Sequence, residues 1–117
     1  MNTDSILESV KKALGITYDY NYFDSQLIMH INSVFLILQQ LGVGPRNGYQ
    51  ITSEADVWSD FLGSSESGRP LNLVQSYMYL RVRLLFDPPT NSFLVESMKQ
   101  QIQEFEWRLN VAVDPAT

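Results

Sequence analysis

Residues 24–42, DSQLIMHINSVFLILQQLG, decide the fold. Their larger apolar residues recur at alternating spacings of four and three, which places them on one face of an α-helix; they are Leu27, Ile31, Val34, Leu38 and Leu41. Asp24 is a suitable N-cap, and Gly42 is a suitable residue to end the helix. Because no charged residue occurs between Ser25 and Pro45, we expect this helix to be the central one of a small helical domain, covered on most sides.

The same helix carries apolar residues on its other side. By helical geometry, Met29 and Leu36 fall opposite the core stripe, beside Asn32, Ser33 and glutamines. Large apolar side chains on an outward face are typical of contact surfaces. We therefore expect this face to be covered by another subunit.

The flanking sequence predicts four more helices. We expect them at residues 4–14, 54–62, 71–86 and from 91 or 92 to about 110. Asp4 or Ser5 would cap the first of these, and Ser53 with Asp56 resembles a capping box for the next. The predicted fold class is all-α, a single-domain bundle of about five helices over residues 1–110, with a mobile tail at 111–117.

Three connecting segments complete this outline. Residues 42–50 and 63–70 are rich in glycine with serine or asparagine and have few apolar residues, so we expect two mobile loops. Between the first two helices, Tyr18, Tyr20 and Tyr22 alternate with polar residues. We expect a packed connector there, whose rings close one end of the core.

Composition limits the classes of function. The chain has 117 residues, 44% of them hydrophobic and 18% charged, which suits one folded domain. Its net charge of −5 argues against a DNA-binding surface, because phosphate neutralisation needs clustered Lys and Arg. There is no cysteine, the N-terminus is too polar for a secretory signal, and the uncharged run is too short and polar for a membrane span. We expect synthesis in the cytoplasm.

Few residues in the sequence support a catalytic or metal-binding function. The single histidine, His30, lies at the edge of an apolar arc and is best interpreted as structural. Asp56 and Asp60 stand four residues apart and could chelate a cation, but a solvated acidic face is the favoured interpretation. Without cysteine or a second histidine, we predict no transition-metal site, no cofactor and no catalytic residues.

Each of the last two predicted helices carries residues whose polarity does not match their position on the helix. Phe93, Gln100 and Trp107 are seven residues apart, so they form a line opposite the core stripe. Either a neighbouring helix or loop covers them, or they contact another chain. Arg81 falls inside an apolar arc, and an ion pair within the domain is favoured over snorkelling or a partner contact.

The C-terminal tail suggests a further contact. Val111 and Val113 alternate with small residues, which is a weak strand signal. Extended tails often bind by adding to an edge or lying in a groove of a partner. A frayed end without a role is an equally good interpretation.

Several segments, taken in order, resemble one known family. They are ILESVKKALGI, FDSQLIMHINSVFLILQQLGVGP, ITSEADVWSDF, YMYLRVRLLFDPP and IQEFEWRLN, and they span roughly residues 5–110. Together they resemble the head-to-tail connector (head-completion adaptor) proteins of long-tailed bacteriophages and the prophages derived from them. None of these segments is a catalytic motif, so the resemblance rests on order, spacing and length.

The resemblance implies a structural virion subunit at the head–tail interface. Copies would form a ring, twelve-fold in the particle, beneath the portal protein, extend the DNA channel without binding DNA specifically, and receive a tail-proximal adaptor or stopper protein. Met29, Leu36, Phe93, Trp107, Val111 and Val113 are then candidates for subunit or partner contacts. Candidates for channel or inter-subunit contacts in the loops are Arg46, Asn47, Tyr49, Glu66 and Arg69.

Two other classes remain open at this point. One is a small helical regulator that binds a single protein through Phe93 and Trp107 and forms no ring. The other is an enzyme that uses a metal held by Asp56 and Asp60.

Overall fold

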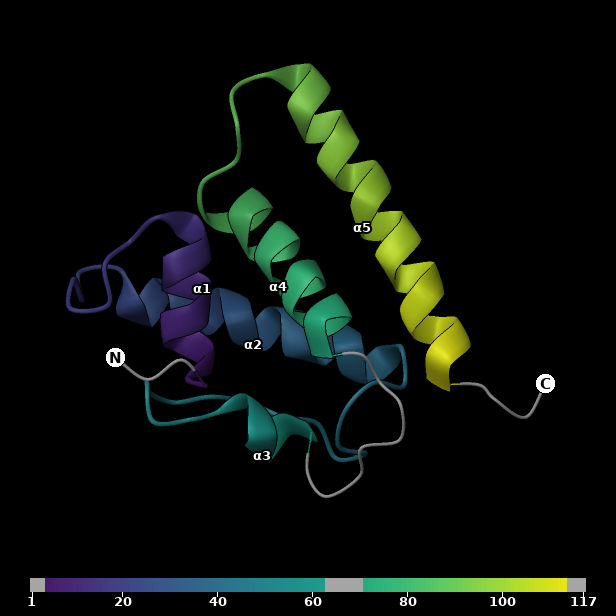
Figure 1. Ribbon diagram of the computed structural model, residues 1–117, viewed down its shortest axis with the longest axis horizontal. Coiled ribbons are helices and arrows are strands. Elements are labelled where there is room, and N and C mark those ends of the chain that lie inside the picture. Colours follow the sequence, from purple (N-terminus) through teal and green to yellow (C-terminus); the bar gives the residue numbers. More distant parts are fainter. Residues whose placement is uncertain (1–3, 63–70, 114–117) are drawn as a thin grey trace.

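The computed structural model describes residues 4–62 and 71–113, and within these ranges the chain forms five helices and no strand (Figure 1). The helices are α1 (Ile6–Leu14), α2 (Asp24–Gln40), α3 (Trp58–Leu62), α4 (Leu71–Phe86) and α5 (Ser92–Val113). The prediction of an all-α domain is confirmed. The fifth helix extends three residues beyond the predicted end, so residues 111–113 are helical and the extended conformation expected for Val111 and Val113 is wrong.

The hub of the fold is α4, because α1, α2 and α5 all pack against it. Its buried residues point in several directions around the helix; they are Val74, Tyr77, Met78, Leu80 and Val82. Helix α2 shares this central position, because it packs against α1 and α4 and its Phe35 meets the rings of α3. Its Met29 and Leu36 remain exposed.

The end of α2 follows its sequence signals, but its start does not. Gly42 adopts φ 85°, and the N–H groups of Gly42 and Val43 donate to the carbonyls of Gln39 (3.0 Å) and Leu38 (2.8 Å). These two bonds form a Schellman motif, which satisfies the last carbonyls of the helix. Asp24 is the first helical residue and not the N-cap; Phe23 holds that position without a side-chain bond.

The carboxylate of Asp24 is used in an ion pair across the fold. Its Oδ1 lies 2.9 Å from Nζ of Lys11, whose side chain on α1 is almost fully buried. The same ammonium donates to the carbonyl of Tyr18 at 2.9 Å. A buried charge needs both a counter-ion and hydrogen bonds, so this pair ties α1 to the start of α2.

The start of α3 also differs from the prediction. The helix begins at Trp58, because the carboxylate of Asp56 accepts from the N–H groups of Thr52 (2.7 Å) and Ser53 (3.2 Å) and holds a turn before it. The hydrogen bond from Thr52, more than the one from Ser53, keeps the pKa of Asp56 below its usual value despite partial burial. Ser5 caps α1 through a bond from the N–H of Glu8.

Residues 42–51 pack onto the core. The rings of Phe35, Tyr49, Trp58 and Phe61 form one aromatic cluster, with Phe35 and Phe61 centroids 4.9 Å apart. Val43 and Ile51, at the two ends of the segment, are buried. The expectation that this loop offers little to bury is therefore wrong.

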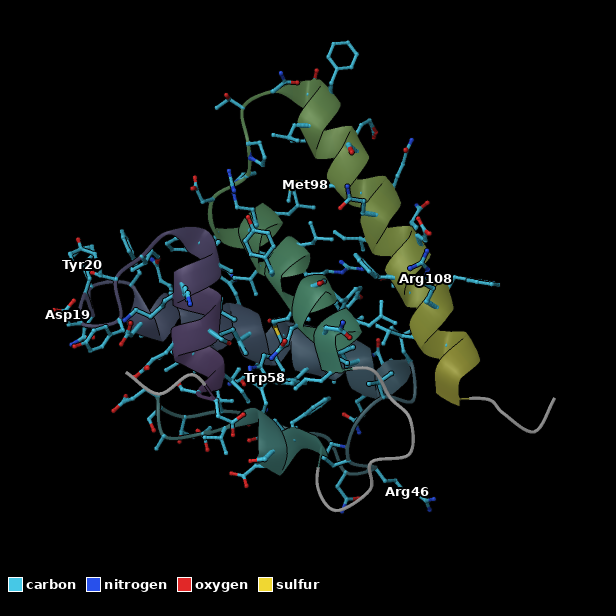
Figure 2. All side chains as sticks on the ribbon, viewed as in Figure 1. Asp19, Tyr20, Arg46, Trp58, Met98 and Arg108 are labelled. Carbon is cyan, nitrogen blue, oxygen red and sulfur yellow. The ribbon has the colours of Figure 1, made fainter. Side chains whose placement is uncertain are left out.

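The tyrosine-rich connector also differs from expectation. Tyr18, Tyr20 and Tyr22 are exposed, and Figure 2 shows Tyr20 at the outer edge of the molecule. Phe23 alone turns inward among the aromatic residues of this segment and meets Phe86 edge-on at a centroid distance of 5.1 Å. Phe23, packed against Phe86 at the end of α4, thus closes this end of the core in place of the three tyrosine rings.

Candidate protein-interaction surfaces

The described surface exposes large apolar side chains on three helices, of which α4 carries Leu85 and the other two, α2 and α5, carry the rest. On α2, Met29 is 59% exposed and Leu36 is 56% exposed. On α5, Phe93 is 85% exposed and Trp107 is 67% exposed. The structure thus places these four residues at the surface, as the helical periodicity predicts, and no helix within residues 4–62 and 71–113 covers Phe93 or Trp107.

The α2 face is uncharged over its whole length. Leu36 borders a shallow pocket of about 310 Å³ that is lined mostly by amide side chains; the lining is Asn32, Leu36, Gln39, Asn47, Gly48, Tyr49 and Gln50. The Nε2 of Gln39 donates to the carbonyl of Arg46 at 3.2 Å, which holds the loop after α2 against the helix. Because the chain is acidic, an uncharged face is where another copy can approach with least repulsion.

Asn32 fixes the edge of this pocket. Its Oδ1 accepts from the N–H of Ile51 at 2.8 Å, and its Nδ2 donates to the carbonyl of Ile51 at 3.0 Å. Both backbone groups of a buried residue are thus satisfied by one side chain. The sequence pattern marked Asn32 only as a polar residue on the outward face, since its partner lies 19 residues away.

The loop residues divide into free and packed side chains. Arg46 and Asn47 are exposed, and Figure 2 shows Arg46 reaching away from the body. Tyr49 packs on Phe35 and Phe61, and burial together with the charges of Asp56 and Asp60 raises its pKa to about 12. Glu66 and Arg69 lie outside the described residues.

Most described side chains of α5 are exposed, and Phe93 and Trp107 lie on one line among them. Asn91 precedes the helix, and its Oδ1 accepts from the N–H groups of Phe93 (2.8 Å) and Leu94 (3.2 Å). Phe93 therefore projects from a capped helix start, and Trp107 lies nearly four turns further along the same line. The ion pair between Glu104 and Arg108 neutralises two charges close to Trp107 in the sequence.

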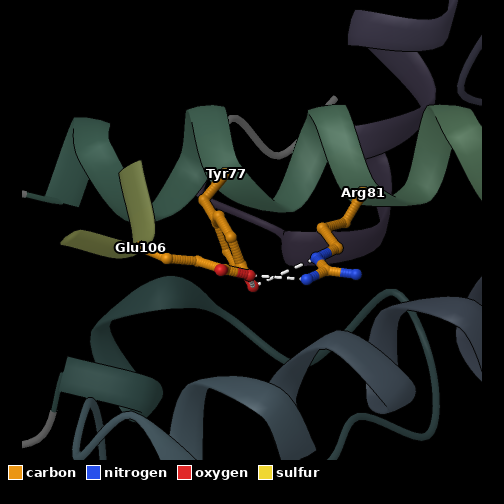
Figure 3. Close-up of polar contacts among 3 residues, drawn as sticks. All are labelled: Tyr77, Arg81 and Glu106. Carbon is orange, nitrogen blue, oxygen red and sulfur yellow. Dashed lines mark hydrogen bonds and ion pairs between the residues drawn. The ribbon is translucent and has the colours of Figure 1, made fainter. Parts of the chain in front are cut away.

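On the side of α5 that faces α4, three side chains form a polar cluster (Figure 3). The Tyr77 hydroxyl donates to Oε2 of Glu106 at 2.7 Å, while Arg81 donates to that same oxygen and to the Tyr77 hydroxyl. The favoured interpretation of Arg81, an ion pair within the domain, is confirmed. Burial acts to raise the pKa of Glu106, but hydrogen bonds from Tyr77 and Arg81 and the Arg81 charge outweigh it and hold this pKa below its usual value.

The profile of the phage connector protein family matches residues 6–116, almost the whole chain. The chain belongs to this family. No curated protein and no solved structure matches it. Membership confirms the resemblance seen in the ordered segments and gives the protein a connector-type structural role in a phage virion.

A hollow of this phage connector family member lies between α1, α4 and α5. It has a volume of about 610 Å³, and its charged lining residues are Glu8 and Lys12. Trp58 reaches its base, where the indole Nε1 donates to Oγ of Ser9 at 3.0 Å. The other lining side chains are apolar or uncharged, so the groove suits packing more than acid–base chemistry.

The residues considered for chemistry have structural surroundings in this connector. His30 is half-buried, with its ring 6.5 Å from that of Phe86. Asp56 organises a turn, and Asp60 is exposed on α3. Among residues 4–62 and 71–113, no group of three or more His, Cys, Asp or Glu side chains is placed to hold a metal ion. In the same described ranges, no helix combines the length and apolar character needed to span a membrane.

Proposed function

We propose that this protein is the repeating subunit of a ring at the head–tail interface of a phage particle. The ring lies beneath the portal protein, lengthens the DNA channel and offers a docking surface to the next tail-proximal protein, an adaptor or stopper. The observation that carries the proposal is the exposure of four large apolar side chains on two helices of a phage connector family member.

The placement of these side chains supports ring formation over a closed dimer. Met29 and Leu36 lie on α2, whereas Phe93 and Trp107 lie on α5, so each copy carries two different apolar faces. When one face of a subunit binds the other face of the next, the contact is heterologous, and such contacts close into rings when the rotation permits. Twelve copies in the particle complete the proposed ring.

Charge supports a passive role toward DNA. The net charge of −5 gives each copy an acidic field, which repels the phosphate backbone. Phosphate binding would require clusters of Lys and Arg. DNA then passes through the ring without specific contacts, and the role is structural and not enzymatic.

The loop and the C-terminal end provide the remaining contacts of the proposal. Arg46 and Asn47 are exposed in the loop beside the uncharged α2 face, which supports a contact with a neighbouring subunit or the channel. We propose that Val111 and Val113, in the last turn of α5, contact the portal or a neighbouring copy.

The test is assembly of the wild type and two alanine variants, followed by sedimentation velocity and negative-stain imaging with and without the cognate portal. Trp107→Ala removes a proposed anchor, and interface anchors of this type carry about 2 kcal/mol or more, so assembly should need roughly thirtyfold more protein. Leu85→Ala is the matched control, because Leu85 is 51% exposed on α4 outside both proposed faces.

Three outcomes contradict the proposal. The first is a wild-type protein that stays monomeric at every concentration, with or without portal. The second is equal assembly by Trp107→Ala and the wild type. The third is a collapse of the melting temperature in Trp107→Ala, because that result would make Trp107 part of the core. A stoichiometric complex with one non-virion protein, and no ring, would favour the regulator.

A further inference from the structure

Helix α5 is attached to the rest of the protein by a narrow seam. It packs mainly against α4, and of the twenty buried apolar residues among those whose side chains the structure describes, three belong to it: Met98, Ile102 and Leu109, with Phe105 partly buried beside them. The other seventeen lie between Ile6 and Val82, on α1–α4 and the segments that connect them. Figure 1 shows α5 on the outside of α4, and Figure 2 shows Met98 between the two helices.

The local sequence of α5 favours a helix without help from the body. The helix is 22 residues long, Asn91 caps its first turn, and Glu104 with Arg108 forms an ion pair one turn apart. Isolated helices become marginal below about 12–15 residues, and this helix exceeds that length. Pro88 and Pro89 separate α4 from α5, and because proline cannot continue a helix, the two remain distinct.

The polar cluster of Tyr77, Arg81 and Glu106 joins the two helices across the seam. Two of its residues are on α4 and one is on α5, so it must break whenever α5 leaves α4. The side chains of Arg81 and Glu106 are 33% and 27% exposed, which places them at the solvent edge of the seam. The guanidinium also lies 5.5 Å from the centre of the Tyr77 ring.

We propose that α5 is an arm that opens from α4 as a unit while α1–α4 stay folded, and that Tyr77, Arg81 and Glu106 form the latch that holds it closed. Opening moves Phe93 and Trp107 relative to the body, because both are carried by α5. The proposal does not depend on the ring function, since it concerns the isolated subunit.

The test uses the absence of cysteine from the chain, which makes a single engineered thiol a specific probe. Ile102→Cys reports on exposure of the seam, and Val34→Cys reports on exposure of the core at α2. Each reporter is combined with Glu106→Gln, which weakens the latch, or with Glu104→Gln. The second change removes the same charge from an exposed pair within α5 and is the matched control. Circular dichroism verifies folding, and the rate of thiol labelling is measured.

We expect Ile102→Cys to be labelled faster than Val34→Cys. Because Glu106→Gln removes a charge-assisted partner from both Arg81 and Tyr77, it should speed labelling of Ile102→Cys about tenfold to a hundredfold. It should leave labelling of Val34→Cys within about twofold, and Glu104→Gln should change neither rate by more than that.

Two results would overturn the proposal. If Glu106→Gln speeds both reporters equally, α5 opens only when the whole domain unfolds. If Glu106→Gln acts no more strongly than Glu104→Gln, the cluster is not a latch. Should Ile102→Cys fail to fold, hydrogen exchange of α5 and α2 amides in the cysteine-free Glu106→Gln and Glu104→Gln proteins decides between the same outcomes.

Discussion

Gly44→Ala tests how firmly the loop after α2 is packed against the core. Gly44 has φ +94°, and a Cβ added there would lie 2.5 Å from Cε1 and 2.8 Å from Cζ of Phe61. Phe61 is 2% exposed and is held between Phe35 and Trp58. The ring has little room to move, so the backbone of the loop must shift.

The expected loss has two parts. Placing a non-glycine residue in the left-handed region costs about 1–2 kcal/mol, and forcing one extra methyl group into a packed core typically costs about 1–3 kcal/mol. Gly15→Ala isolates the first part, because Gly15 has φ +83° and a Cβ there would meet nothing within 4 Å. We therefore expect Gly44→Ala to lower the free energy of unfolding by about 1–3 kcal/mol more than Gly15→Ala.

The assay is equilibrium urea unfolding, followed by circular dichroism at 222 nm, with thermal melts as a second measure. A domain of this size should lose about 3–6 °C of melting temperature per kcal/mol. A double variant, Gly44→Ala with Phe61→Leu, should lose less than the sum of its parts because the smaller side chain relieves the clash. Equal losses for Gly44→Ala and Gly15→Ala would refute the packing of this loop onto Phe61.

Two further predictions concern the polar contacts that hold the fold. Asn32→Ala leaves both backbone groups of Ile51 without their side-chain partner, so we expect it to lower the free energy of unfolding by about 1–3 kcal/mol in the same urea experiment. The control is Ser33→Ala, at an exposed neighbouring position, which should change the free energy of unfolding by under about 0.5 kcal/mol. The folded-state pKa values of Glu106 and Asp56 lie below their ordinary values of 4.5 and 3.8. Their contribution to the free energy of unfolding is therefore complete above those values and is lost as the pH falls below them. The free energy of unfolding should drop on acidification, and the drop should be shallower in Glu106→Gln. Equal pH slopes of the free energy of unfolding in wild type and variant would contradict the role given to Glu106.

Local sequence signals determined most of the helices and the exposed faces. The spacing of apolar residues placed Met29 and Leu36 opposite the core of α2, and the same rule placed Phe93 and Trp107 on the outer line of α5. Gly42 ended α2 as predicted. Its left-handed backbone conformation lets the N–H groups of Gly42 and Val43 form the two Schellman hydrogen bonds that close the helix. Family membership was also readable from the order and spacing of short segments.

Tertiary structure decided the features that depend on partners distant in the sequence. Asp24 forms an ion pair with buried Lys11 and does not cap α2 as its position predicted. Asp56 holds a turn where the sequence predicted the start of a helix. The position of α4 between α1, α2 and α5 also came from the tertiary structure, because helix periodicity shows which face is apolar but not how many neighbours surround it. Arg81 pairs with Glu106, which lies 25 residues further along the chain, and this pair joins α5 to α4. Neither segment predicts the pair from its own sequence.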